Sequence, residues 1–218
     1  MTQDLNVEVV DRDGAIREAL DDVASSSRRD WLRRAVTGGG LLLVGGVAVK
    51  GLPFLQATAA PSKSGDVAIL NFALTLEYLE SAFYAEANKK GALSGATAAF
   101  AKTVGDHEAA HVAFLRKALG SKAVKKPTFD FMGTTSDMAK FQATAVALED
   151  TGVAAYNGQG PNLTKATLGA AAMIVSVEAR HAAWIRDIIR KLPAPDAFDP
   201  PMTKAQVLAA VKATGFIQ

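Results

Sequence analysis

Two short segments of the chain each carry a glutamate and a histidine three residues apart. They are EAAHVAFLR at residues 108–116 and EARHAAWIR at residues 178–186. Positions three apart lie side by side on one face of a helix, so the glutamate and histidine of each segment can bind the same ion. One such pair arises easily by chance on a surface helix. The chain has only three histidines, however, and two of them fall at matching places, which predicts a metal site.

A second motif precedes each pair and extends the repeat. Glu77 follows a leucine and is followed seven residues later by Tyr84, and Glu149 has the same neighbours, with Tyr156 as its tyrosine. Both halves therefore read Leu-Glu-x6-Tyr and then Glu-x-x-His, which we interpret as a duplicated helical hairpin. The candidate metal ligands are Glu77, Glu108, His111, Glu149, Glu178 and His181.

This ligand set indicates a site for two metal ions. Four carboxylates and two imidazoles at one level of a helical bundle supply bridging and terminal ligands, which suit iron or manganese. Burying the charged carboxylates there without metal would cost many kcal/mol of folding free energy, or the carboxylates would take up protons. Taken singly, Glu77 and Glu149 could equally lie on a solvated helix face. The chain has no cysteine, which excludes disulfides, thiolate nucleophiles, cysteine-ligated zinc and rubredoxin-like iron.

The segments that must position these ligands are predicted to be helical. Alanine and leucine are abundant, and valine and isoleucine do not alternate strictly with polar residues, which indicates an all-α chain. We expect Asp66 to cap the first helix and Pro193 to stop the fourth. The expected helices span residues 66–87, 94–119, 136–158 and 163–192, with a further short helix at 203–213.

The connection between the second and third helices is long for a hairpin turn. It spans residues 121–135 and shows no helical period. Fifteen extended residues reach roughly 50 Å, which exceeds the ~34 Å length of a 23-residue helix. This segment can therefore cross from one end of a bundle to the other.

Residues 66–192 resemble the ferritin-like superfamily, and their pattern is nearest to rubrerythrin and bacterioferritin. The run NFALTLEYLE at residues 71–80 is similar to the exported ferritin-like and desiccation-related proteins. The resemblance implies an all-α ferritin-like four-helix bundle with one long crossover between helices two and three, followed by a short C-terminal helix.

The resemblance also implies roles for particular residues. Glu108 and Glu178 correspond to bridging metal ligands, and Tyr84 and Tyr156 to tyrosines that bond ligand carboxylates across the site. The alternative for the tyrosines is ordinary core packing with a bonded hydroxyl. Glu80, one turn from Glu77, is the alternative ligand on the first helix, but it has no tyrosine seven residues later. We therefore expect Glu80 beside the ligands or on the path of incoming ions. The duplication predicts that His111 and His181 are near equivalents, one on each metal.

The resemblance suggests two functions. The first is a di-iron (or di-manganese) protein that oxidises ferrous iron with oxygen or peroxide, with two iron ions as its cofactor, manganese being the other option. The alternative is a non-enzymatic stress or desiccation protein in which a metal holds the bundle together. The chain lacks the cysteine-rich donor domain of rubrerythrin-type peroxidases, and nothing in it indicates a cage-forming ferritin.

The N-terminal region, residues 1–59, resembles a leader for twin-arginine export, and residues 60–218 are expected to form the bundle domain. The leader pattern comprises SRRDWLR at 27–33, a weakly apolar run at 35–49, and a small-x-small cleavage pattern at 57–59. The apolar run of 15 residues is short for a membrane span, which needs about 20. We therefore expect export through the twin-arginine machinery to the periplasm or outside, with an uncleaved membrane anchor as the alternative.

The charge balance bears on partners. Lysines and arginines number 24 against 22 aspartates and glutamates, giving a formal net charge of +2. Such a balance does not favour nucleic acid as a partner. The expected partners are metal ions, oxygen or peroxide and the export machinery, and the chain could form a homodimer.

Overall fold

The computed structural model describes residues 43–44, 47–48 and 60–218. The chain divides into two units, residues 1–56 and 57–218. In the first unit, strand β1 (Leu43–Val44) pairs antiparallel with strand β2 (Val47–Ala48). The twin-arginine motif and the cleavage pattern lie outside the described residues. Among the helices that the structure does describe, none combines the length and apolar character needed to cross a membrane.

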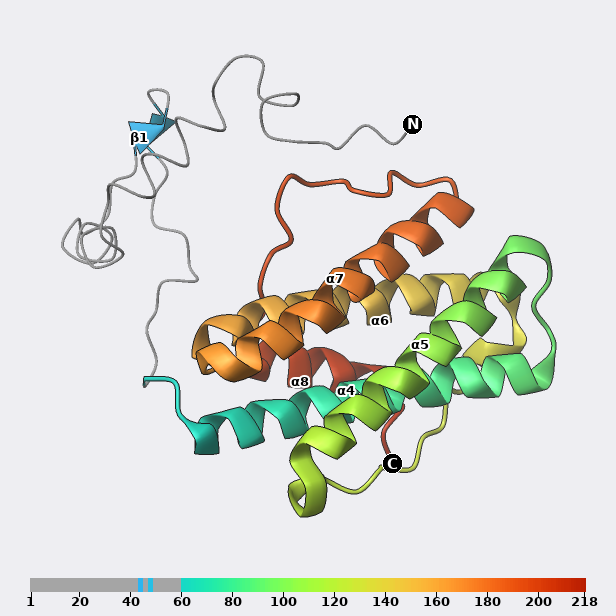
Figure 1. Cartoon of the computed structure of the whole chain (residues 1–218). Coiled ribbons are helices and arrows are strands. Elements are labelled where there is room, and N and C mark those ends of the chain that lie inside the picture. The colour runs from blue at the N-terminus through green and yellow to red at the C-terminus, as the bar shows by residue number, and fades with distance from the viewer. Residues whose placement is uncertain (1–42, 45–46, 49–59) are drawn as a thin grey trace, which may run out of the picture. The chain divides into compact units, whose positions relative to one another are not determined.

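The second unit is a bundle of four long helices, as predicted (Figure 1). The helices α4 and α5 form one antiparallel hairpin, and α6 and α7 form the other. This arrangement confirms the all-α bundle and places the two halves of the sequence repeat in the two hairpins. The four helices are α4 (Lys63–Lys90), α5 (Gly95–Leu119), α6 (Met138–Gln159) and α7 (Lys165–Ile188).

The prediction that Asp66 caps the first helix is wrong. Ser62 is the N-cap of α4, and its side chain accepts a hydrogen bond from the backbone N–H of Gly65. Asp66 lies in the first turn, is buried, and accepts hydrogen bonds from the backbone N–H of Thr164 at 2.9 Å and from the hydroxyls of Thr164 and Thr167. Because Thr164 is the N-cap residue of α7, Asp66 joins the starts of two helices.

The fourth helix also ends earlier than predicted. α7 ends at Ile188, before Pro193, because Arg190 adopts a left-handed conformation with φ of 59°. The backbone N–H of Lys191 then bonds the carbonyl of Arg186, and that of Arg190 bonds the carbonyl of Asp187. This is the hydrogen-bond pattern of a Schellman motif, whose left-handed residue is usually glycine. An arginine at that place gave no sequence signal.

The long crossover between α5 and α6 runs along α4. Near its start, the Asn71 side chain donates to the carbonyl of Lys122 at 2.9 Å and accepts from the backbone N–H of Val124 at 2.8 Å. Near its end, the hydroxyl of Thr135 donates to Glu86 at 2.5 Å. Asn71 and Glu86 are about four turns apart on one helix, so the connection runs along more than half of α4 from one end of the bundle toward the other, as predicted.

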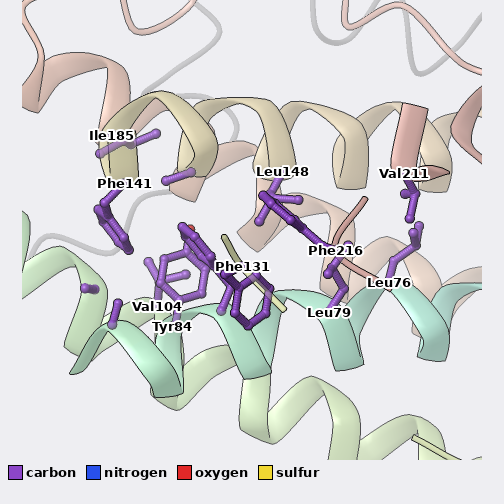
Figure 2. Packing of buried hydrophobic residues seen from close by; sticks show 14 of the residues in the cluster. Leu76, Leu79, Tyr84, Val104, Phe131, Phe141, Leu148, Ile185, Val211 and Phe216 are labelled. Atoms are coloured by element: carbon purple, nitrogen blue, oxygen red, sulfur yellow. The ribbon is translucent and has the colours of Figure 1, made fainter. Parts of the chain in front are cut away.

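The short C-terminal helix, α8 (Lys204–Thr214), is part of the core. It begins with a capping box formed by Thr203 and Gln206. Val211 and, after the helix, Phe216 are buried in the same cluster as Leu76 and Leu79 of α4 (Figure 2). The C-terminal segment therefore covers a side of the bundle that would otherwise be exposed.

The lead-in to α8 lies very close to α6 at Gly158. The backbone N–H of Met202 bonds the carbonyl of Ala154, and a Cβ added to Gly158 would lie 1.8 Å from the carbonyl oxygen of Met202. No side chain fits at this position, so the contact between the C-terminal segment and the bundle requires glycine here.

We predict that Gly158→Ala destabilises the bundle. The new methyl group displaces backbone rather than a flexible side chain, and we expect a loss of about 1–3 kcal/mol in the free energy of unfolding. Thermal unfolding followed by circular dichroism measures it. Gly169→Ala is the matched control, because nothing lies within 4 Å of that Cβ on α7. The control should be neutral or more stable by up to about 1 kcal/mol, since alanine favours helix. Equal stability of the two variants would contradict the prediction.

Candidate metal centre

The six predicted ligands and Glu80 gather in the interior of the bundle. Each falls on the inward stripe of its helix, which explains why acidic residues lie among apolar ones. The four predicted glutamate ligands are at most 1 % exposed, and Glu80 is 3 % exposed. The helices contribute Glu77 and Glu80 from α4, Glu108 and His111 from α5, Glu149 from α6, and Glu178 and His181 from α7.

His111 faces three carboxylates with one ring nitrogen. Its Nδ1 lies 3.2 Å from Glu77, 3.3 Å from Glu108 and 3.1 Å from Glu178. A ring nitrogen carries at most one hydrogen, so it cannot donate to three oxygens at once. The arrangement has the form of ligands around a cation.

His181 has a similar environment on the other side of Glu108. Its Nδ1 lies 3.2 Å from Glu108 and 3.2 Å from Glu149. The ring centroids of His111 and His181 are 6.3 Å apart, so the two imidazoles belong to one site.

The potential ligands form two groups that share two glutamates. In each group one ligand atom per residue lies within 4.8 Å of the others, a spacing that one ion can bridge with small side-chain adjustments. The shared residues, Glu108 and Glu178, are those expected to act as bridges. The first group is Glu77, Glu108, His111 and Glu178, and the second is Glu108, Glu149, Glu178 and His181.

Four buried carboxylate oxygens in this cluster lack a hydrogen-bond donor. They are Oε2 of Glu77, Oε1 of Glu108 and both oxygens of Glu178. Buried polar atoms in native proteins are nearly always satisfied, and an ion is one of the accepted explanations when they are not. The donor set of carboxylates and imidazoles suits iron or manganese, so these residues fit a pair of such ions.

The two tyrosines direct the terminal carboxylates. Tyr156 donates its hydroxyl to Oε1 of Glu77 at 2.5 Å, and Tyr84 donates to Oε1 of Glu149. In both glutamates the other oxygen, Oε2, faces a histidine. Each tyrosine belongs to the opposite half of the repeat from the glutamate that it holds. Burial, followed by the charge of the bonded glutamate, raises the pKa of both tyrosines well above 10, so they remain donors.

The cluster has shifted protonation equilibria. Burial raises the pKa of Glu80, Glu108 and Glu178 well above the ordinary value of 4.5, and repulsion between neighbouring carboxylates adds to it. Burial alone would lower the pKa of His111, but its contacts with Glu108, Glu178 and Glu77 raise it to about 12. Without metal, the folded protein therefore holds protons in this cluster.

Gly152 makes room for Glu80, a feature that we did not predict. Glu80 stands three residues after Glu77, and Gly152 stands three residues after Glu149, so the two are equivalent in the repeat. A Cβ on Gly152 would lie 3.2 Å from Oε1 of Glu80 and 3.1 Å from Oε2 of Glu178. The missing side chain thus leaves space for a fifth carboxylate beside a bridging one.

His107 also contacts the cluster, although no motif in the sequence predicts a role for it. Its Nδ1 lies 2.9 Å from Nε2 of His181. Burial, followed by the charges of His181 and His111, lowers the pKa of His107, which favours the neutral form. Its place directly before Glu108 was the one available signal, but only the packing of α5 against α7 brings it to His181.

Comparison with known protein families agrees with this geometry. A family model described as a ferritin-like domain matches residues 65–191. The chain belongs to the ferritin-like family. No curated protein matches the chain.

The ferritin-like domain covers all four helices and every residue of the acidic cluster. It begins within α4 and ends just after α7, so α8 lies beyond it. The family assignment and the buried cluster together support a metal-binding bundle.

We predict that the metal-free ferritin-like bundle loses stability as pH rises. The unfolded chain releases the glutamate protons near pH 4.5, whereas the folded cluster keeps them to higher pH, so the folded state binds more protons in between. His111 acts in the same direction above pH 6.5, because its folded pKa of about 12 is also raised. The melting temperature of the metal-free protein should therefore decrease as the pH rises from 5 to 8.

We expect the opposite for the metal-loaded protein. Its ligands must lose protons to bind an ion, so metal binds more tightly as the pH rises, and the melting temperature should increase from pH 5 to pH 8. Glu80→Gln removes one titrating carboxyl and should flatten the decrease in the metal-free protein. A metal-free midpoint that increases from pH 5 to pH 8 would refute the assignment of protonated glutamates.

Proposed function

We propose that this ferritin-like chain is an exported di-iron (or di-manganese) protein that oxidises ferrous iron with oxygen or peroxide. The observation that supports it most is the pair of ligand groups sharing Glu108 and Glu178. One metal would be held by Glu77 and His111 and the other by Glu149 and His181, with the shared glutamates as bridges. Two metals held this closely can act together on one small oxidant.

The metal pair, when bound, would supply the redox chemistry, which is the transfer of two electrons from ferrous iron. Hydrogen peroxide with two protons would be reduced to two waters, or oxygen with two protons would be reduced to hydrogen peroxide. The protein's part is to hold and orient. Tyr156 and Tyr84 fix Glu77 and Glu149, and the apolar clusters on either side exclude water.

Protons for such a reaction are at hand in the cluster. Glu80 is buried next to Glu178, and burial, followed by the charge of Glu178, raises the pKa of Glu80 well above its ordinary value, which favours its protonated form. Solvent reaches the edge of the site at α5, where the His111 side chain is 13 % exposed. A small oxidant could enter there.

We predict that the metal-free protein binds about two equivalents of ferrous iron under anaerobic conditions and oxidises them when oxygen or peroxide is added. Ultraviolet absorbance and chelator assays measure both steps. Glu108→Ala removes a bridge from both metals, so it should abolish oxidation while the bundle stays folded.

Asp106→Ala is the matched control, because Asp106 is exposed on the same helix and pairs with Lys102 outside the cluster. It should bind and oxidise iron like the original chain. Binding of well under two equivalents, or no oxidation by the original chain, would reject the proposal. A large drop in melting temperature of metal-loaded Glu108→Ala, with no oxidation by the original chain, would instead favour the non-enzymatic stress or desiccation function.

Export by the twin-arginine route is the second part of the proposal. It is supported by Arg28 and Arg29, the apolar run at 35–49 and the small residues at 57–59. A pathway that carries folded proteins suits a chain that takes up metal before it crosses. Export to the periplasm or outside would then leave a mature protein that starts near Ala60.

We predict that replacing both Arg28 and Arg29 with lysine keeps the protein in the cytoplasm, because the twin arginines are the signal that the machinery reads. Cell fractionation and N-terminal sequencing of the exported protein measure it. Cytoplasmic retention of the unaltered chain, or an exported chain that still begins at Met1, would count against a cleaved leader.

A further inference from the structure

The duplication that builds the metal centre is not symmetric around its two histidines. His107 directly precedes the Glu-x-x-His motif of α5, and Val177 holds the same place in α7. An imidazole therefore stands in one half where the other half has an aliphatic side chain. His107 makes its contact across the bundle, with His181.

The contact with His107 engages the second ring nitrogen of His181. Nδ1 of His181 faces the carboxylates of Glu108 and Glu149, and Nε2 lies 2.9 Å from Nδ1 of His107. The two rings are nearly parallel, with centroids 5.2 Å apart and 19° between their planes. Within residues 60–218 the structure shows no comparable hydrogen bond to Nε2 of His111.

A hydrogen bond at Nε2 decides what Nδ1 can do. Two neutral imidazoles bond only if one nitrogen donates and the other accepts. With Nε2–H of His181 donating to Nδ1 of His107, Nδ1 of His181 keeps its lone pair for an ion. Such a partner fixes both the tautomer and the orientation of a ligating ring, and its loss typically weakens metal affinity by about 10–100-fold.

Burial follows the same asymmetry. The His181 side chain is 3 % exposed, whereas that of His111 is 13 % exposed. His111 must therefore adopt its ligating orientation without a comparable bond at Nε2 and closer to solvent. The two positions share Glu108 and Glu178, so these bridges do not distinguish them.

We propose that His107 is a positioning residue that makes the metal position of Glu149 and His181 the tighter one, leaving the position of Glu77 and His111 as the weaker, exchangeable one. The inference rests on the proposed dinuclear site. It replaces the near equivalence of His111 and His181 that the sequence repeat predicts. The centre then loads in a fixed order, and the ion near solvent is the one that exchanges.

Cobalt(II) is the probe for the test, because its visible absorption reports its ligands and needs no oxidation. Titration of the metal-free protein should show two binding steps that differ at least tenfold in affinity. His107→Ala should weaken the tight step about 10–100-fold and leave the weak step and the total of two ions unchanged. His107→Asn should restore the tight step, since its amide oxygen can stand close to where Nδ1 stands and accept the same hydrogen.

Two further variants assign the steps. His181→Ala should remove the tight step, and His111→Ala should remove the weak one. Asp106→Ala, next to His107 but bonded to Lys102, should behave like the original chain. His107 is exposed on α5 and loses only its contact with His181, so its replacement should lower the melting temperature of the metal-free protein by no more than about 4 °C.

The outcomes separate this inference from the proposed function. Two ions bound with equal affinity, an unchanged tight step in His107→Ala, or loss of the weak step in His181→Ala would each overturn the role of His107 while the dinuclear site remains. Binding of one ion or none by the original chain would overturn both. Failure of His107→Asn to restore the tight step would show that the hydrogen bond is not the cause.

Discussion

Five glutamates lie buried in the middle of this bundle. Removing charged carboxylates from water costs free energy, and the rest of the structure depends on how that cost is offset. Neither lysine nor arginine is among the buried polar residues of the part that the structure describes, so no permanent cation offsets the charges. The remaining ways to neutralise them are protons, the two histidines or bound metal. The raised pKa of Glu80, Glu108 and Glu178 reflects the first. The shared ligand groups favour the last.

The scaffold around the glutamates serves this constraint. Two apolar clusters adjoin the buried glutamates, one containing Tyr84 and the other Tyr156. The hydroxyl of Tyr84 donates a hydrogen bond to Glu149, and that of Tyr156 donates one to Glu77. Phe83 and Phe141 stack at 5.0 Å next to Tyr84 and fix the spacing of α4 and α6. The two tyrosine hydroxyl groups therefore connect the apolar packing to the acidic site.

Duplication of a helical hairpin explains most of the site, and two positions at which the halves differ are also informative. Gly152 is the repeat equivalent of Glu80, and because it has no side chain, one carboxylate fits where two would not. Val177 is the repeat equivalent of His107, so His111 has no imidazole in the place that His107 takes beside His181. Both departures break the equivalence of the two groups of potential ligands. A repeat in sequence thus specifies a pair of similar sites, and single substitutions on facing helices decide how they differ.

The sequence by itself determined the helical class, the four long helices and the crossover between the second and third of them, and it predicted the six candidate ligands. These follow from spacing along one chain, because three- and seven-residue intervals have fixed meaning on a helix. Ferritin-like membership follows from the same residues and is confirmed by the family model over residues 65–191.

Only the tertiary structure decided which side chains meet across helices. Asp66 bonds Thr164, His107 reaches His181, and Gly152 lies against Glu80, and each pair joins helices whose relative angle and offset are set by core packing rather than by local sequence. The end of α7 depended on a left-handed arginine that no residue type announced. Contacts between distant segments depend on how whole faces interlock, and that information is spread over many apolar residues instead of one motif.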